Sequence, residues 1–301
     1  MEQDTPRTYV EKLRKSSREN SSIVCVGLDP LPSCYPFPEL PPAEQIVKTY
    51  EQLFEKMSAR QMVPGSFKPN IGYYHRLDRP LQGDFSGSLA LAEVFKLLRE
   101  AFPETPVILD AKRGDIATSS ANYAEEAFSA WEADAVTIAP YMGSDSTGPF
   151  LKWYTEGRGV YILNRTSNPG GRELQNLQLA GSNQPLYLEV ADAISRAAKN
   201  YPGTGAVVGA TNPRELEDIA AFYAERDIPL LIPGVGGQGG SAERTVQGLR
   251  GSGYPLELAR INSSSGITHP WAKQKQTAPA DWLQVCIDAL VRLTEEIAYE
   301  Q

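Results

Sequence analysis

The sequence is poor in the residues from which metal and disulfide sites are built. It has three cysteines and two histidines in 301 residues. Because Cys25, Cys34 and Cys286 are scattered, odd in number and form no C-x-x-C pair, we expect reduced thiols and no zinc site. With His75 and His269 as the only histidines, we expect no histidine-rich metal centre either.

Long apolar runs and a basic excess are also missing. No apolar run approaches the eighteen or so residues of a membrane span, and residues 1–4 are polar and acidic. We therefore expect neither an anchor nor a signal peptide, and a cytoplasmic protein. A net charge of −8 and a pI near 5.0 disfavour nucleic acid as a partner. An anionic small substrate would need a local positive pocket that works against the overall field.

What the sequence does contain is a regular alternation of short apolar runs with amphipathic segments. Strands are predicted at 22–28, 66–68, from 107, and at 135–140, 159–164, 205–209, 228–234 and 258–262. Helices are predicted at 7–20, 43–60, 88–101, 119–132, near 150, at 186–200, from 211, and at 242–250 and 281–299.

Eight β-α units in one chain predict an α/β protein of the (β/α)8 TIM-barrel class, with residues 1–301 as a single domain. The alternative is a doubly wound open sheet. Its phosphate loop would normally follow the first strand, and the segment G-L-D-P at 27–30 is no G-x-G-x-x-G. Neither fold explains the insertion at 73–84.

Charged residues follow three of the predicted strands. Asp110 and Lys112 end the third strand, and regular alternation would put both on one face, with Asp115 on the loop beyond. Asp29 and Lys68 end the first two strands. A surface ion pair is the plainer explanation, but carboxyl ends of buried strands are where barrels keep their chemistry. We expect these groups to converge, and to be ionised as a coupled set near neutral pH.

Two loops late in the chain have the composition of a phosphate site. A glycine-rich loop at 233–240 follows strand seven, and a Ser/Gly loop at 262–266 follows strand eight. Backbone N–H groups approach a phosphate without obstruction in such loops. Ser167 precedes Asn-Pro-Gly after strand five, which indicates either a simple turn or a polar ring contact.

Together these motifs resemble one enzyme family. The run D-A-K-R-G-D-I at 110–116, Lys68 before proline, Ser167 before N-P-G, and P-G-V-G-G-Q-G-G at 233–240 are similar to the longer bacterial branch of the orotidine 5'-phosphate decarboxylase family. The resemblance runs from residue 26 to about 266. It implies a homodimeric (β/α)8 barrel that makes UMP and carbon dioxide from orotidine 5'-phosphate in pyrimidine biosynthesis, without cofactor or metal.

The resemblance also implies roles for the charged residues. Lys112 would donate a proton to C6 of the pyrimidine, and Asp110 would lie against the departing carboxylate. Asp115 would enter from the partner subunit. Lys68 and Asp29 would hold the ribose hydroxyls and the charge network.

Further substrate-binding residues implied by the resemblance are Ser119, Ser167, Gly237, Gln238, Ser264 and Ser265. Ser167 would contact the pyrimidine edge, and Gln238 would bridge base and phosphate. Ser119 falls where the family usually has a threonine that reaches the partner's ribose. Backbone amides around Ser264 and Ser265 would bind the phosphate.

One departure from the family matters. The family normally reads S-S-R-G after strand eight, with the arginine on the phosphate, whereas residues 263–266 read S-S-S-G. Arg260, Lys273 and Lys275 are the candidates to supply the missing charge.

Two other functions remain open at this point. One is a metal-dependent phosphosugar aldolase or decarboxylase of the same superfamily, which shares D-x-K-x-x-D but has a glutamate where this chain has Lys68. The other is a catalytically silent nucleotide-binding regulator, suggested by the missing arginine alone. Retention of the whole charged set favours the decarboxylase.

Overall fold

The chain folds as a (β/α)8 barrel, as the strand pattern predicts. The computed structural model describes residues 8–236, 239–297 and 299. Its eight parallel strands are β1 Val24–Leu28, β2 Ser66–Pro69, β3 Ile108–Arg113, β4 Ala135–Ile138, β5 Gly159–Arg165, β6 Thr204–Val208, β7 Leu230–Ile232 and β8 Ala259–Ser263. Their order is β2-β1-β8-β7-β6-β5-β4-β3. Parallel bridges from Phe67 to Val107 and from Asn70 to Asp110 join β2 to the β3 segment and close the ring.

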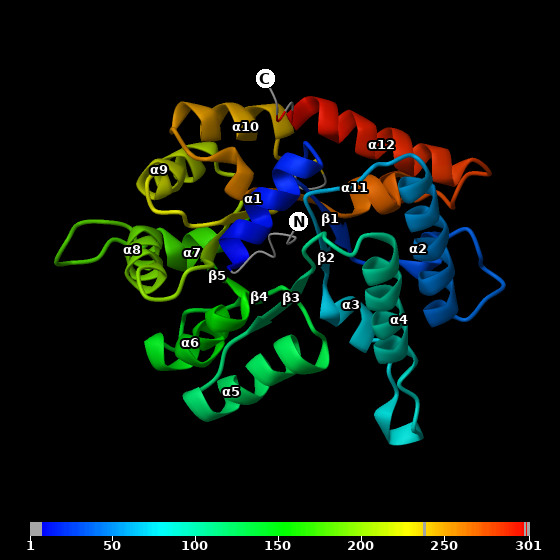
Figure 1. Cartoon of the computed structure of the whole chain (residues 1–301), viewed down its shortest axis with the longest axis horizontal. Helices are drawn as coiled ribbons and strands as arrows, with labels where there is room; N and C mark the ends of the chain where they lie inside the picture. The colour runs from blue at the N-terminus through cyan, green and yellow to red at the C-terminus, as the bar shows by residue number, and fades with distance from the viewer. Residues whose placement is uncertain (1–7, 237–238, 298, 300–301) are drawn as a thin grey trace, which may run out of the picture.

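Helices surround the strands on the outside (Figure 1). The longer ones are α1 Tyr9–Glu19, α2 Pro42–Ala59, α4 Ser86–Ala101, α5 Ala117–Glu125, α6 Ser144–Leu151, α8 Leu186–Ala198, α9 Pro213–Tyr223, α10 Ala242–Gly251 and α12 Trp282–Ile297. Short helices are α3 Ile71–His75, α7 Gly171–Gln175 and α11 Ser265–Thr268. Single turns of 3-10 helix are η1 Pro32–Cys34, η2 Pro80–Gln82, η4 Lys152–Glu156, η5 Leu256–Leu258 and η6 Pro270–Gln274.

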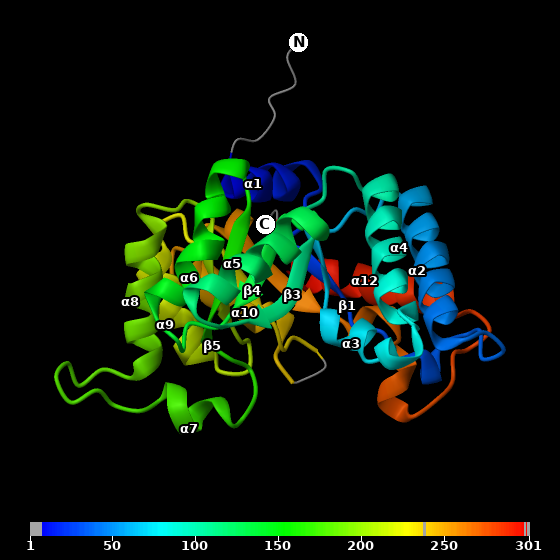
Figure 2. The ribbon, with the colours of Figure 1, turned by 90° about the horizontal axis from the view of Figure 1, so that it is seen from below.

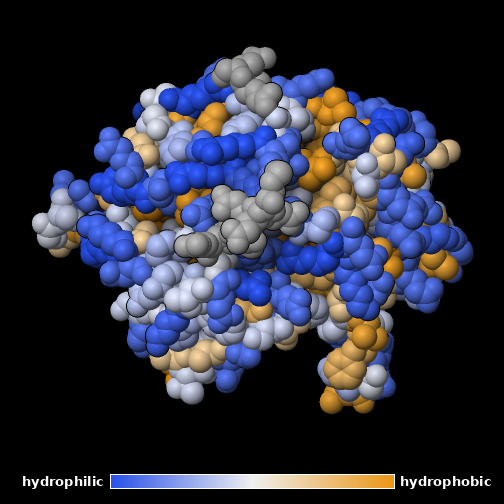
Figure 3. Space-filling model, viewed as in Figure 1, coloured by the Kyte–Doolittle hydropathy of each residue, from blue (hydrophilic) through white to orange (hydrophobic). Residues whose placement is uncertain are grey.

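Three predicted segments differ in detail. The helix expected at 119–132 is α5 followed by a π-helical stretch, Glu126–Ala130. The polar loop after β5 contains α7. The insertion at 73–84 begins inside α3 and then forms a loop closed by an antiparallel bridge between Arg79 and Asp84. This loop, in which Leu81 is exposed, projects from the body of the molecule (Figure 3).

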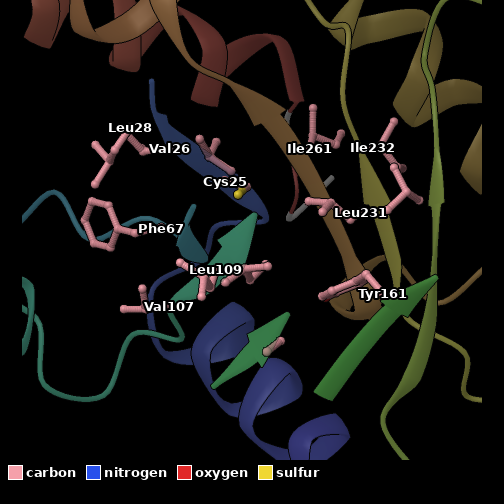
Figure 4. Close-up of a cluster of buried hydrophobic side chains, with 14 of the residues drawn as sticks. Cys25, Val26, Leu28, Phe67, Val107, Leu109, Tyr161, Leu231, Ile232 and Ile261 are labelled. Carbon is pink, nitrogen blue, oxygen red and sulfur yellow. The ribbon is translucent and has the colours of Figure 1, made fainter. Parts of the chain in front are cut away.

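The strands carry the core. Every residue of β1, β2, β4, β6, β7 and β8 is buried, as expected for parallel strands covered on both faces. Figure 4 shows side chains from these strands, among them Val26, Phe67 and Ile261, in one apolar cluster.

Cys25 and Cys286 are buried free thiols, and burial raises their pKa to about 11 and about 12. No helix within the described part of the chain is both long and apolar enough to cross a membrane.

Helix α1 covers the amino-terminal end of the barrel, opposite the loops that follow the strands (Figure 2). A capping box fixes its start, because Thr8 accepts from the Glu11 amide and the Glu11 carboxylate accepts from the Thr8 amide. Its Tyr9 hydroxyl donates to the Tyr161 hydroxyl of β5 at 3.2 Å. A Cβ at Gly159 would lie 2.1 Å from the Tyr9 ring, so only glycine fits under this helix.

Arg260 fastens α1 to the base of the barrel. Its side chain is fully buried. The guanidinium donates to the carbonyl oxygens of Leu13, at 2.8 Å, and Gly65, at 3.0 Å, and to the Ser17 hydroxyl at 3.0 Å. It also donates to the carbonyls of Ala259 and Glu257. All five contacts lie at the amino-terminal end of β8, so the expectation that Arg260 could bind a phosphate is wrong.

We predict that Arg260→Leu destabilises the protein by about 3 kcal/mol or more, because it leaves several buried carbonyl oxygens without a donor. Urea unfolding measures the change. The matched control is Arg214→Leu at an exposed position of α9, which should stay within about 0.5 kcal/mol of the parent. Equal stabilities of the two variants would contradict the structural role of Arg260.

Candidate active site

A cavity of about 780 Å³ opens at the carboxyl ends of the strands. Each strand, or the residue directly after it, contributes to its wall: Asp29, Lys68, Asp110, Thr137, Leu163, Val207, Leu231 and Asn262. The volume is that of a small-molecule site. The expectation that the strand ends meet at one mouth is therefore confirmed for Asp29, Lys68, Asp110 and Lys112, which all line this cavity.

Asp110 is the centre of an ion cluster in the cavity wall. One carboxylate oxygen lies 2.8 Å from the Lys68 ammonium, and the other lies 2.6 Å from the Lys112 ammonium. Asp29 lies 4.0 Å from the Lys68 ammonium, too far for a hydrogen bond but within reach of its charge. Both lysines therefore share one carboxylate, with a second carboxylate nearby.

The cluster keeps its buried members charged. Burial alone would raise the pKa of Asp110, but the ammonium groups of Lys68 and Lys112 outweigh it and hold that pKa well below its usual range. Burial would lower the pKa of Lys68, but Asp110 and Asp29 outweigh it and raise that pKa above its usual range. Asp110 and Lys68 are thus ionised near neutral pH. The Lys112 side chain is 48% exposed and lines the cavity.

A bulge, and not regular alternation, brings Lys112 beside Asp110. The pairing of β3 with β4 shifts register between Leu109 and Arg113, and Lys112 has a φ of 46°. Positive φ is rare for a residue with a side chain, and such strain collects at functional sites. The hydroxyl of Thr137 on β4 accepts from the backbone amides of Ala111 and Lys112 and donates to Asp110 at 2.8 Å. The bulge is therefore held by the same group that holds the carboxylate.

Asp115 lies outside this cluster. It follows the end of β3, is partly exposed, and accepts a hydrogen bond from the Ile116 amide. It is neither in the cavity wall nor in any ion pair among the described residues. Ser119, on α5, is likewise absent from the wall formed by the described residues. One chain by itself does not bring these two residues to the site.

The loops after β7 and β8 form another part of the cavity wall. Pro233, Gly234 and Val235 line it, with Ser264 and Ser265 from the other loop. The β7 loop folds back on itself, because the amide at 240 donates to the carbonyl at 234 and the amide at 236 to the carbonyl at 240. The glycines at 234, 236 and 239 have φ of 97°, 72° and 92°, which only glycine adopts readily. Gly237 and Gln238 lie outside the described residues.

Ser167 lines the cavity. Its carbonyl oxygen accepts from the Thr211 hydroxyl at 2.7 Å, which fixes the loop after β5 against the loop after β6. Gly209 allows this approach, because a Cβ there would lie 2.6 Å from the Ser167 Cα.

Several wall residues were not singled out from the sequence for this site, among them Asn70, Thr137, Asn262 and His269. Asn70 and Asn262 lie at or just after the end of a predicted strand, which was the available signal for them. Thr137 lies inside a predicted strand and His269 lies seven residues after one, so the sequence offered no such signal for these two. Burial lowers the pKa of His269 to about 4, which leaves its ring neutral at neutral pH. Within the described ranges, no three His, Cys, Asp or Glu side chains are grouped closely enough to hold a metal ion.

Known proteins are similar to this chain in sequence and in fold. The sequence model described as Orotidine 5'-phosphate decarboxylase / HUMPS family matches residues 22–252. An orotidine 5'-phosphate decarboxylase of Delftia acidovorans is 40% identical over 266 residues, 87% of this chain and 90% of that protein. The enzyme of the same name from Cupriavidus taiwanensis is 41% identical over 91% of this chain and 93% of its own length.

The solved structure of Leishmania donovani OMP decarboxylase superposes with a TM-score of 0.72 at 28% identity, over 96% of this chain and 98% of that one. The family model covers far more than half of the chain, and the relatives match over nearly their whole length. The chain therefore belongs to the orotidine 5'-phosphate decarboxylase / HUMPS family.

Proposed function

We propose that this chain is a carboxy-lyase that converts orotidine 5'-phosphate to UMP and carbon dioxide. The observation that carries the proposal is the cluster of Lys68, Asp110 and Lys112 at the barrel mouth of a chain in this family. The reaction leaves an electron pair on a ring carbon with little delocalisation, so the barrier is high. A fixed array of charges is a suitable means of lowering it.

In the proposed mechanism the substrate carboxylate lies beside Asp110. The bond from C6 to the carboxyl carbon breaks, carbon dioxide leaves, and the electron pair stays on C6. The Lys112 ammonium stabilises that charge and then gives C6 a proton, which leaves a neutral amine that solvent reprotonates. Lys68 and Thr137 hold Asp110 in place throughout, so no group has to reorient as charge develops. No step of this mechanism uses a cofactor.

The remaining assignments concern binding. Asp29 and Lys68 would hold the ribose hydroxyls, and Ser167 the pyrimidine edge. Backbone amides of Ser264 and Ser265 would contact the phosphate. Their support is that all five residues line one cavity. Gly237 and Gln238 keep their proposed roles on the base and phosphate from the resemblance alone.

The proposal also includes a homodimer in which Asp115 and Ser119 serve the partner's site. Asp115 stands apart from the cluster of its own chain. Beside it, on the loops after β3 and β4, the apolar side chains of Ile116, Tyr141 and Met142 are exposed. Exposed apolar side chains grouped at one end of a barrel favour a protein interface there.

An absorbance assay for loss of orotidine 5'-phosphate, run with and without a chelator, tests the proposed activity. We expect turnover that the chelator leaves unchanged. Turnover lost to the chelator would favour the metal-dependent phosphosugar enzymes of the superfamily. Binding of UMP without turnover would favour the silent regulator.

Lys112→Ala should lower kcat by about 10³-fold or more, because it removes both the proton donor and the charge that stabilises C6. UMP binding should persist, since the residue acts on the developing carbanion. Lys199→Ala, at an exposed lysine after α8, is the control and should keep full activity. A Lys112→Ala rate within tenfold of the parent would remove Lys112 from the mechanism.

Mixing inactive subunits tests the shared site. A Lys112→Ala chain paired with an Asp115→Ala chain forms one intact site per heterodimer, so random exchange should restore roughly a quarter of the sites. Subunit exchange is first shown with differently tagged parents. If exchange occurs and no activity returns, Asp115 serves its own chain.

A further inference from the structure

Within the described part of the chain, one cation in the cavity wall has no counter-ion. Lys68 and Lys112 are both paired with Asp110. Lys273 also lines the cavity, and none of the described acidic side chains lies within ion-pair distance of it. Its ammonium donates one hydrogen bond, at 3.3 Å, to the carbonyl oxygen of Gly236. No acidic side chain among the described residues therefore compensates the positive charge of Lys273 at the site.

Lys273 lies close to both the glycine-rich loop after β7 and the serine-containing loop after β8. It belongs to η6, which follows the β8 loop and α11 along the chain. Its bond to Gly236 brings the ammonium to the loop after β7. That bond is long, exposed and made to a neutral acceptor, so an anion can displace it at little cost.

The segment that carries Lys273 is anchored. The neighbouring Trp271 is buried, and its indole N–H donates to the Cys34 carbonyl oxygen at 2.7 Å. The Ala272 amide donates to the His269 carbonyl oxygen. The lysine stem thus extends from a fixed backbone, while its ammonium keeps the reach of a flexible side chain.

The other two basic residues proposed from the sequence, and the histidine of the cavity wall, do not fit. Arg260 lies at the base of the barrel with its guanidinium fully used. Lys275 is not part of the cavity wall. His269 is in the wall, but it is buried beside Tyr35 and bonded to the Thr268 hydroxyl, which leaves it a neutral ring.

We infer that Lys273 binds the phosphate group of the nucleotide and supplies the charge that Ser265 lacks. The inference rests on the proposed function for the identity of the nucleotide. It assigns a phosphate monoester as the ligand of an ammonium that enters from beyond the β8 loop. Phosphate recognition is then built from η6, in addition to the two loops.

The test compares ligands with and without the phosphate. In Lys273→Met the dissociation constant of UMP should rise roughly tenfold to a hundredfold, the loss expected for one charge-assisted hydrogen bond. The dissociation constant of uridine should stay within twofold. Lys273→Arg should keep UMP binding within about threefold of the parent, because it retains the charge.

Lys275→Met is the matched control, a lysine two residues away on the same segment and outside the cavity wall. It should bind UMP like the parent. Equal weakening of UMP and uridine in Lys273→Met, unchanged UMP binding in that variant, or a loss in Lys275→Met instead would each overturn the inference.

Turnover separates this inference from the proposed function. If the parent protein binds UMP through Lys273 but does not decarboxylate orotidine 5'-phosphate, the inference about the phosphate site holds and the proposed reaction is wrong. If the parent protein decarboxylates orotidine 5'-phosphate but substitution of Lys273 leaves UMP binding unchanged, the proposed reaction holds and the inference about Lys273 is wrong.

Discussion

The mouth of this barrel depends on the buried carboxylate of Asp110. Strands β2, β3 and β4 each supply one donor to it, from Lys68, Lys112 and Thr137. Burying an ionised carboxylate costs several kcal/mol unless it is paired and hydrogen-bonded, and these three donors offset that cost. Lys68, only 4% exposed, depends on Asp110 in return. The same carboxylate therefore keeps Lys68 charged in the interior and holds the ammonium group of Lys112 in position.

The two ends of the barrel use buried charge in opposite ways. At the base, Arg260 gives its donors to backbone carbonyls and one hydroxyl under α1, where no ligand can enter. At the mouth, Asp110 takes its donors from side chains that border a cavity. Backbone carbonyls suit a group that only holds the fold together, whereas charged side chains that border a cavity can act on a ligand. This division matches the general rule that barrels keep stability at the amino-terminal face and chemistry at the carboxyl-terminal face.

Much of this arrangement could be predicted from the sequence, and the exceptions have physical reasons. Apolar runs located the strands, and strand ends located Asp29, Lys68 and Asp110, because parallel strands all end at one mouth. The bulge could not be predicted, since left-handed backbone at Lys112 depends on the Thr137 hydroxyl across the sheet. Thr137 itself looks like any β-branched strand residue.

Arg260 shows an error of another kind. It is the second residue of β8, so it lies at the base, while Asn262 two residues later reaches the cavity. The end of β8 follows from the sequence pattern, but a residue near the start of the strand cannot reach the cavity at its end. Asp115 and Ser119 stay predictions, because their proposed partners lie in another chain.

Charge balance explains why the proposed phosphate site matters for the proposed reaction. Lys68 and Lys112 are already matched by Asp110 and Asp29, so the substrate carboxylate meets no surplus of positive charge at the cluster. Placing that carboxylate beside Asp110 is unfavourable until carbon dioxide leaves. The free energy for it must come from a part of the substrate that does not react. Lys273, in the same cavity, has no acidic partner among the residues that the structure describes. A phosphate bound there supplies such energy without neutralising the charges that act on C6.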